Sequence, residues 1–328
     1  MNLTAGLGLR RRQPGVAAAV ALWLAGWSAA ALAQPAAPPP ATLSEAGRAA
    51  MTAMAKSPQP PEGDVPARRA FLDKFQQDFG AAQARRYPVD IGASTMAGVP
   101  VRLVRPKGAA APGNLVLLNL HGGGFNADSG SLTETIPIAA LTKIPVVAVL
   151  YRLAPEHPFP AAVDDALAVY RELLKTHKPS QIGVFGTSAG AILGPELVAR
   201  LQKERLPSPA VLGVFSGDAD FAHQGDSAAS LPPDAFRSYL GAVPPSDPLA
   251  SPALGPVASF PPTLCLASSR DFLLSPTANF CRRLELAGVE NKLVVWDGLP
   301  HAFWAYMAIP ESDEAFGVMA RWLRSHLR

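Results

Sequence analysis

Residues 186–190 read Gly-Thr-Ser-Ala-Gly, a G-x-S-x-G pattern centred on Ser188. The apolar run 182–185 precedes this stretch, and residues 191–206 follow it with helical character. A strand, a tight turn and a helix in this order form a nucleophile elbow, which presents a serine hydroxyl above the end of a sheet. The N-terminus of the following helix then lies beneath the negative charge that develops in the reaction. The pattern therefore predicts that Ser188 is a nucleophile.

Apolar runs separated by helical stretches continue this arrangement on either side of the elbow. The runs predicted as strands are 101–104, 115–120, 146–150, 182–185, 211–215, 263–267 and 293–296. The stretches predicted as helices are 132–141, 161–175, 191–206, 276–287 and 311–326. Apolar runs that do not alternate with polar residues are typical of a parallel sheet covered on both faces. The predicted fold class is therefore α/β, with a mostly parallel central sheet and helices on both faces.

Residues with reactive side chains directly follow several of the predicted strands. His121, Ser188, Asp271 and His301 all lie just after such a run. Right-handed crossovers place the carboxyl ends of parallel strands at one edge of the sheet, where ligands bind. We therefore expect these residues to converge on one site.

The predicted strand 115–120 runs into His-Gly-Gly-Gly-Phe at residues 121–125. Glycines let backbone N–H groups point inward without obstruction by a Cβ atom. Two such donors, together with the N–H of the residue after the nucleophile, form an oxyanion hole. A flexible loop is the plainer interpretation, but the position after a strand and upstream of G-x-S-x-G favours the oxyanion hole.

A nucleophilic serine needs a histidine base and a carboxylate that orients this base. In this architecture they follow the serine in the order Asp or Glu, then His. His301 fits, because it comes directly after the predicted strand 293–296. Asp271 fits the carboxylate, because it follows the strand 263–267. Asp297 is the alternative, although it would crowd the strand end that already carries His301.

Three blocks of sequence together resemble one known family. They are residues 121–125, residues 186–190 and residues 151–165, which read Tyr-Arg-Leu-Ala-Pro-Glu-His-Pro-Phe-Pro-Ala-Ala-Val-Asp-Asp. This combination is similar to the hormone-sensitive-lipase-like α/β-hydrolases, the bacterial family IV esterases, in their Gly-Thr-Ser-Ala-Gly branch. The resemblance extends from about residue 101 over most of the remaining chain, including Asp-Pro-Leu-Ala-Ser-Pro at 247–252.

The resemblance implies a serine carboxylesterase that uses no cofactor and no metal and has N-terminal helices capping its site. The implied catalytic residues are Ser188, Asp271 and His301, and the implied oxyanion donors are Gly123, Gly124 and Ala189. The substrates implied are short to medium acyl esters or lactones, cleaved through an acyl-enzyme. Thr187 stands where many members have Asp, and Ala191 replaces a frequent glycine; we expect both to alter pocket shape without removing activity.

The first 33 residues have the features of a secretory signal peptide. Arg10, Arg11 and Arg12 precede an apolar stretch at about 16–30, and Ala-Leu-Ala at 31–33 offers a cleavage site. An uncleaved anchor is the alternative, but the apolar stretch is short for a span of about 20 residues. A twin-arginine signal is weakly supported, since the usual bulky apolar residues are missing. The sequence thus predicts an exported protein, periplasmic or secreted.

Charge excludes some classes of partner. The 328-residue chain has 29 Lys and Arg and 26 Asp and Glu, and the predicted signal peptide carries three of the basic residues and no acidic ones. The mature chain would have 26 of each and be formally neutral. We therefore expect neither a nucleic acid partner nor stable insertion of the mature chain in a membrane. The sequence leaves the oligomeric state open.

The chain is predicted to divide into a signal peptide (1–33), a disordered spacer (34–40), a helical cap segment (41–86) and the catalytic domain (87–328). In the cap segment Asp64 is expected to cap a helix. Phe71, Phe75 and Phe79 then form a stripe that either packs on the domain or serves as a lid. The long excursion 217–262, with a helix expected at 234–240, is predicted to rim the pocket.

Other residues carry less specific expectations. Phe125, Phe303 and Trp304 are predicted as apolar walls of the substrate pocket. Cys265 and Cys281 are expected to be buried thiols, with a disulfide as the alternative if the chain is exported.

Glu156 and His157 are expected to hold the loop beside the oxyanion glycines rather than to form a second acid–base pair. The alternative function is a non-catalytic ligand-binding protein on the same scaffold, which the complete set of reactive residues disfavours. A serine peptidase is a third interpretation, disfavoured because such enzymes usually carry a large extra domain.

Overall fold

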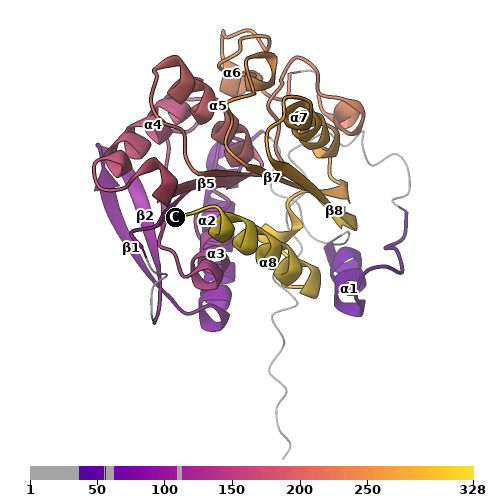
Figure 1. Cartoon of the computed structure of the whole chain (residues 1–328). Coiled ribbons are helices and arrows are strands. Elements are labelled where there is room, and N and C mark those ends of the chain that lie inside the picture. The colour runs from indigo at the N-terminus through magenta and orange to yellow at the C-terminus, as the bar shows by residue number, and fades with distance from the viewer. Residues whose placement is uncertain (1–36, 55, 57–62, 109–112, 233) are drawn as a thin grey trace, which may run out of the picture.

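A sheet of eight strands, flanked by helices, forms the body of the protein within the described residues (Figure 1). The computed structural model describes residues 37–54, 56, 63–108, 113–232 and 234–328, so the predicted signal peptide lies outside them. The strands are β1 (Val89–Met96), β2 (Val99–Pro106), β3 (Val116–Leu120), β4 (Val146–Val149), β5 (Ile182–Thr187), β6 (Val211–Phe215), β7 (Thr263–Arg270) and β8 (Asn291–Pro300). The helices are α1 (Glu45–Met54), α2 (Val65–Arg86), α3 (Thr135–Thr142), α4 (Ala161–Leu174), α5 (Ala189–Lys203), α6 (Arg237–Leu240), α7 (Leu274–Leu286) and α8 (Pro310–Ser325).

The strands lie in the order β1-β2-β4-β3-β5-β6-β7-β8. The pairs β1–β2 and β2–β4 are antiparallel, and every pair from β4 to β8 is parallel. The carboxyl ends of the parallel strands therefore meet at one edge of the sheet, with β5 between β3 and β6. The predicted α/β fold with a mostly parallel sheet is confirmed.

Helices cover both faces of the sheet and bury a separate apolar cluster on each (Figure 1). On β3 the side chain of Leu118 belongs to the cluster under α4, α5 and α7, and that of Leu117 to the cluster with α2, α3 and α8. Successive side chains of a strand point to opposite faces. Because both faces are covered, all five residues of β3 are buried, which explains the continuous apolar run in the sequence.

The strand β1 was missed by the sequence analysis. It is half-exposed at the edge of the sheet, and its Ile91 is 44% exposed, so no continuous apolar run marks it. Ala97 and Gly98 join β1 to β2 in a two-residue hairpin loop, with φ values of 50° and 84°. This loop is a known hairpin signal, because two positive φ angles match the twist of the flanking strands.

The cap segment forms α1 and α2 as two separate helices. Asp64 caps α2 as predicted, with its Oδ1 accepting a hydrogen bond from the Ala67 N–H at 2.9 Å. α1 is attached near the start of α8, where Glu311 accepts hydrogen bonds from the backbone and the hydroxyl of Ser44 at 2.6 and 3.0 Å. α2 reaches the same region at its end, where Arg86 forms an ion pair with Asp313 of α8.

The phenylalanine stripe of α2 serves packing. Phe75 and Phe79 are buried, their rings stack with centroids 5.4 Å apart, and they share an apolar cluster with Leu132 and Ile136. Phe71 is only partly buried. The buried face of α2 is directed at the segment leading into α3. Of the two alternatives for these rings, packing on the domain or a lid, the structure therefore shows packing.

Two further segments differ from expectation. Part of the predicted spacer contacts the domain, since Arg270 Nη2 donates a hydrogen bond to the Pro38 carbonyl at 2.8 Å. In the excursion 217–262 the helix expected at 234–240 is a single turn, α6, which begins only at Arg237. No helix in the described part of the chain is long and apolar enough to span a bilayer.

Both cysteines are buried free thiols, as predicted. Cys281 on α7 donates a hydrogen bond from Sγ to Asn291 Oδ1 at 2.9 Å. Burial raises the pKa of the Cys265 thiol well above its usual value, and the neighbouring Cys281 adds to this effect. The Cys265 thiol is therefore uncharged at neutral pH.

Candidate active site

The turn between β5 and α5 forces Ser188 into an unusual backbone conformation, with φ 57° and ψ −122°. Its N–H donates to the Phe215 carbonyl at 2.9 Å, and its side chain stays partly exposed. Gly190 allows the turn to be this tight, since a Cβ atom there would lie 1.7 Å from the Leu120 carbonyl oxygen. The stretch 186–190 therefore folds as the predicted elbow.

The residues predicted to act with Ser188 lie in hydrogen-bonding order. His301 Nε2 is 2.9 Å from Ser188 Oγ, and His301 Nδ1 is 2.7 Å from Asp271 Oδ1. Asp271 is 2% exposed and its Oδ1 also accepts from the Leu273 N–H at 2.8 Å. This is the geometry of a serine–histidine–aspartate triad.

The rival carboxylate, Asp297, lies elsewhere. Its oxygens accept hydrogen bonds from Thr42 Oγ1 at 2.8 Å and from Ser269 Oγ at 3.0 Å, on an exposed part of the surface. These two hydroxyls hold the pKa of Asp297 below its usual range. Asp297 therefore supports the contact between the N-terminal segment and β8, and Asp271 is the carboxylate at the base.

The loop after β3 lies against the elbow. A Cβ atom on Gly122 would be 3.0 Å from the Thr187 carbonyl oxygen and 3.4 Å from Ser188 Cβ. Gly123 and Gly124 have φ values of 122° and 64°, and a Cβ on Gly123 would lie 2.0 Å from the Ala127 carbonyl oxygen. Only glycine fits there.

The predicted oxyanion donors all lie at this junction. The N–H groups of Gly123, Gly124 and Ala189 donate to no carbonyl or side chain among the described residues. Ala189 opens α5, so its N–H also adds to the positive end of the helix dipole. The arrangement leaves backbone donors free beside the Ser188 hydroxyl, as stabilisation of an oxyanion requires.

With this geometry the chain can be compared with known proteins. A sequence profile of the alpha/beta hydrolase fold matches residues 117–305. An acetyl-hydrolase of Streptomyces hygroscopicus is 32% identical over 281 residues, which cover 80% of this chain and 91% of that protein. An ethyl acetate hydrolase of Pseudomonas putida is also 32% identical, over 80% of this chain and 90% of its own length.

Solved structures agree with these sequence matches. The crystal structure of esterase E25 has a TM-score of 0.77 at 29% identity and covers 90% of this chain and 98% of its own. An esterase of the bacterial hormone-sensitive lipase family has a TM-score of 0.74 at 27% identity and covers 84% and 94%. The chain is a hormone-sensitive-lipase-like α/β-hydrolase. The family predicted from the sequence is confirmed, and the enzyme is a carboxylic ester hydrolase.

The block at 151–165 supports the oxyanion loop of this hydrolase. The Tyr151 ring stacks on His121 with centroids 4.1 Å apart, and its hydroxyl donates to the His121 carbonyl at 2.6 Å. The Ala154 N–H donates to the Phe125 carbonyl at 2.9 Å. The block therefore fixes both ends of the glycine stretch.

Glu156 has a structural role in the same region. It forms an ion pair with Arg69 of α2 at 2.7 Å, and this hydrogen bond lowers the pKa of Glu156 to about 2. Arg69 also donates to the carbonyls of Asn126 and Ala154 at 2.7 and 3.0 Å. His157 is exposed. Glu156 holds the loop beside the oxyanion glycines, as expected, and α2 contributes to the same contact through Arg69. The expectation for the exposed His157 stays a prediction.

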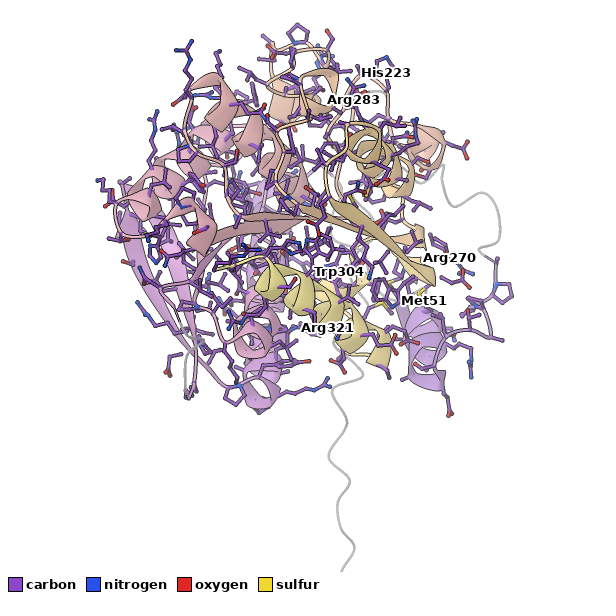
Figure 2. All side chains as sticks on the ribbon, viewed as in Figure 1. Met51, His223, Arg270, Arg283, Trp304 and Arg321 are labelled. Carbon is purple, nitrogen blue, oxygen red and sulfur yellow. The ribbon has the colours of Figure 1, made fainter. Side chains whose placement is uncertain are left out.

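The three residues predicted as walls of the substrate pocket are buried in the core of the hydrolase. Phe125 is 1% exposed and stacks on Tyr239 of α6 with centroids 3.4 Å apart. Phe303 and Trp304 are fully buried, and Figure 2 shows Trp304 between the sheet and α8. They were expected to face the substrate because they are bulky and close to the reactive residues in the sequence. Phe125 instead packs on Tyr239, and the turn after His301 directs Phe303 and Trp304 into the core.

Two residues at the site were missed by the sequence analysis. The Phe272 ring stacks on His301 with centroids 4.3 Å apart and is partly exposed, so it can contact a substrate. Ser216 follows β6 and donates a hydrogen bond from its hydroxyl to Asp271 Oδ2. Ser216 directly follows a strand, and Phe272 directly follows the predicted acid Asp271. These positions are the signals that would have identified the two residues.

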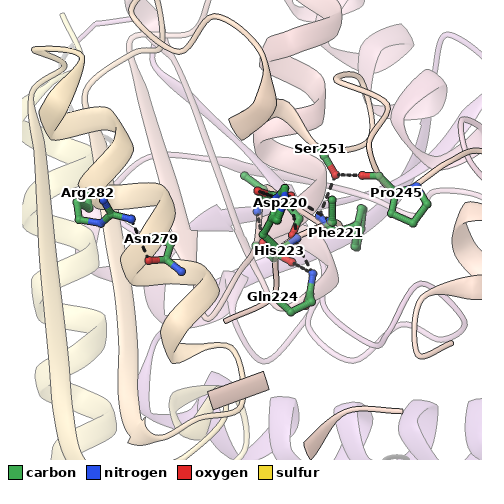
Figure 3. Close-up of polar contacts among 11 residues, drawn as sticks. Asp220, Phe221, His223, Gln224, Pro245, Ser251, Asn279 and Arg282 are labelled. Carbon is green, nitrogen blue, oxygen red and sulfur yellow. Dashed lines mark hydrogen bonds and ion pairs between the residues drawn. The ribbon is translucent and has the colours of Figure 1, made fainter. Parts of the chain in front are cut away.

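The excursion of this hydrolase is held by its own polar contacts (Figure 3). Ser251 Oγ accepts from the Phe221 N–H at 2.8 Å and donates to the Pro245 carbonyl at 2.6 Å. His223 Nδ1 lies 3.0 Å from Asp220 Oδ2. Together with the stacking of Tyr239 on the oxyanion loop, these contacts make the excursion a support behind that loop.

Proposed function

We propose that this ester hydrolase cleaves short to medium acyl esters, or compact lactones, through an acyl-enzyme formed on Ser188. The observation that carries the proposal is the chain of hydrogen bonds from Ser188 through His301 to Asp271. A non-catalytic ligand-binding protein would have no need for these hydrogen bonds. The relatives named acetyl-hydrolase and ethyl acetate hydrolase also argue against a non-catalytic function.

In the first half of the reaction Ser188 Oγ attacks the ester carbonyl carbon while its proton passes to His301 Nε2. The carbonyl oxygen becomes an oxyanion, which the free N–H groups of Gly123, Gly124 and Ala189 stabilise. The bond to the alcohol oxygen then breaks, and this oxygen takes the proton from His301. Asp271 stabilises the imidazolium that exists between these two proton transfers.

In the second half a water molecule replaces the alcohol. His301 takes one of its protons while the water oxygen attacks the acyl carbon of the ester on Ser188. The second oxyanion collapses, the bond to Ser188 Oγ breaks, and the serine recovers its proton from His301. The carboxylic acid leaves, and the enzyme returns to its starting state.

The preference for small acyl groups rests on two supports. The names of two relatives refer to an acetyl group and to ethyl acetate, and Phe272 stacks on the imidazole of His301, beside which a substrate must bind. Each methylene that becomes buried contributes about 0.8 kcal/mol until the chain reaches a wall.

A series of p-nitrophenyl esters from acetate to palmitate, with lactones of increasing ring size, tests this proposal. We expect kcat/KM to be highest for a short or medium chain and to fall for long ones. A maximum at palmitate, or a jump in rate when the substrate forms droplets, would instead indicate a lipase.

We also propose that the enzyme is exported and that residues 1–33 are removed. The basic residues followed by an apolar stretch and Ala-Leu-Ala support this. Expression in a bacterial host, fractionation, and N-terminal sequencing of the periplasmic form would test it. An intact N-terminus on a membrane-bound form would favour an anchor.

A further inference from the structure

A carboxyl group that the proposed mechanism does not use lies directly behind the elbow. Glu134, just before α3, is 2% exposed. Its Oε2 accepts a hydrogen bond from Asn119 Nδ2 on β3 at 3.2 Å. The Thr187 hydroxyl and the Gly122 backbone lie beside this carboxyl group, and each lowers its pKa. Gly122 opens the oxyanion loop and Thr187 precedes the nucleophile, so the carboxyl group lies beside both parts of the site.

The elbow is also bonded to the segment that carries the base. Trp304, which follows His301 by one short turn, donates from Nε1 to Thr187 Oγ1 at 3.2 Å. This hydrogen bond joins the histidine segment to the elbow at the residue beside which the Glu134 carboxyl group is buried.

The surroundings of Glu134 favour its uncharged form. A Cβ on Gly130 would lie 1.9 Å from Glu134 Oε1, so the glycine makes room for the carboxyl group. Oε1 itself has no hydrogen-bond partner among the described residues. Ionisation would leave this buried oxygen without a donor, which is costly. Burial accordingly raises the pKa of Glu134 to about 8.

A neighbouring anion also favours the uncharged form of Glu134. Asp128, on the loop before it, raises the pKa of Glu134 further. Burial acts to raise the pKa of Asp128, but His121, the two hydrogen bonds from Ser131 and Arg102 on β2 together hold it below its usual value. Burial raises the pKa of Tyr151 well above its usual value, so this residue stays neutral. The region thus already holds one anion when Glu134 is protonated.

We propose that Glu134 is a positioning residue for ester hydrolysis: its uncharged carboxyl group is buried behind the elbow and the oxyanion loop and supports both, and loss of its proton lowers turnover. This inference rests on the site proposed above, where the oxyanion forms beside Gly122 and Ser188. A second negative charge behind that position opposes the developing oxyanion, and the effect is strong in a buried, poorly screened region. Because a neutral ester carries no such charge before the reaction, kcat falls and KM does not.

The test is the dependence of kcat and KM on pH for a short acyl ester, from about pH 6 to about pH 10. We expect the wild type to lose kcat at alkaline pH with a midpoint near the pKa of Glu134, about 8. Glu134→Gln keeps the shape of the side chain but cannot ionise. It should retain kcat at neutral pH within about threefold and show no loss at alkaline pH.

Asp218 provides a matched control. It is a buried carboxyl group that does not contact the elbow, and burial raises its pKa to about 7. Asp218→Asn should keep the alkaline loss of kcat seen in the wild type. An unchanged alkaline loss in Glu134→Gln, or its disappearance in Asp218→Asn alone, would overturn the role of Glu134.

A second variant decides the question if Glu134→Gln does not fold. The Thr187 hydroxyl lowers the pKa of Glu134, so Thr187→Val should move the alkaline loss to higher pH. A loss at unchanged pH would contradict the proposal. Failure of the proposed site gives a different result, because the Ser188→Ala variant would then retain ester hydrolysis at every pH.

Discussion

The hydroxyl of Ser216 donates a hydrogen bond to the oxygen of Asp271 that faces away from His301. Ser216 follows β6 and Asp271 follows β7, so neighbouring parallel strands deliver the two residues to the same edge of the sheet. One carboxylate oxygen is then held by the serine, while the other accepts from the imidazole. The orientation of the base therefore depends on a residue with no role in the bond-breaking steps.

Ser216→Ala should lower kcat about tenfold, because a hydrogen bond to a charged group is worth about 1.5 kcal/mol or more. KM for a short ester should change little. Ser269→Ala is the matched control, since Ser269 donates to the exposed Asp297 and should leave kcat unchanged. Equal activity of both variants would show that Leu273 and His301 suffice to hold Asp271.

Ser188→Ala should fold and lose nearly all ester hydrolysis, because triad members act as a unit. A fluorophosphonate reagent should label Ser188 in the wild type, and mass spectrometry of the labelled peptide would locate the adduct. Substantial turnover by the variant would exclude the proposed acyl-enzyme.

Asp271→Asn should lower kcat by about 10⁴-fold, because an amide cannot hold His301 in the required tautomer. Asp297→Asn is expected to keep near wild-type kcat, since the Asp297 side chain accepts hydrogen bonds from Thr42 and Ser269 on an exposed part of the surface. The two variants can be compared on one substrate at one pH. A larger loss in Asp297→Asn would reverse the assignment.

Asp218→Asn should make stability less dependent on pH. Burial raises the pKa of Asp218 in the folded protein to about 7, above its unfolded value of 3.8. A raised acid pKa contributes stability at low pH that is lost as the pH rises towards 7. The Tm of the variant should therefore fall less than that of the wild type between about pH 4 and about pH 7. Parallel curves for the two proteins would count against this shift.

The sheet was predictable because its central strands are buried on both faces. Residues in β3 and β6 form continuous apolar runs for that reason, and the glycines of the elbow and oxyanion loop mark positions with no room for a Cβ. The edge strand β1 was not predictable from apolar runs, since solvent covers much of it. Its hairpin turn, Ala97-Gly98, was the better signal.

The positions of Ser188, Asp271 and His301 also followed from the sequence, because each directly follows a strand in the order this architecture requires. Their supports did not. Ser216 follows a strand, but no local pattern specifies its contact with Asp271 or the contact of Glu134 with Asn119. Phe303 and Trp304 were predicted as walls of the substrate pocket but are buried in the core. Their proximity to His301 in the sequence did not determine which way their side chains point.

The backbone of Ser188 has a consequence for the evolution of this enzyme. A non-glycine residue at φ 57° and ψ −122° is strained by roughly 1–3 kcal/mol. Ser188→Gly would relieve that strain and, at the same time, remove the nucleophile. Selection for thermal robustness alone would therefore favour an inactive protein at this position, so the elbow persists only while hydrolysis itself is under selection.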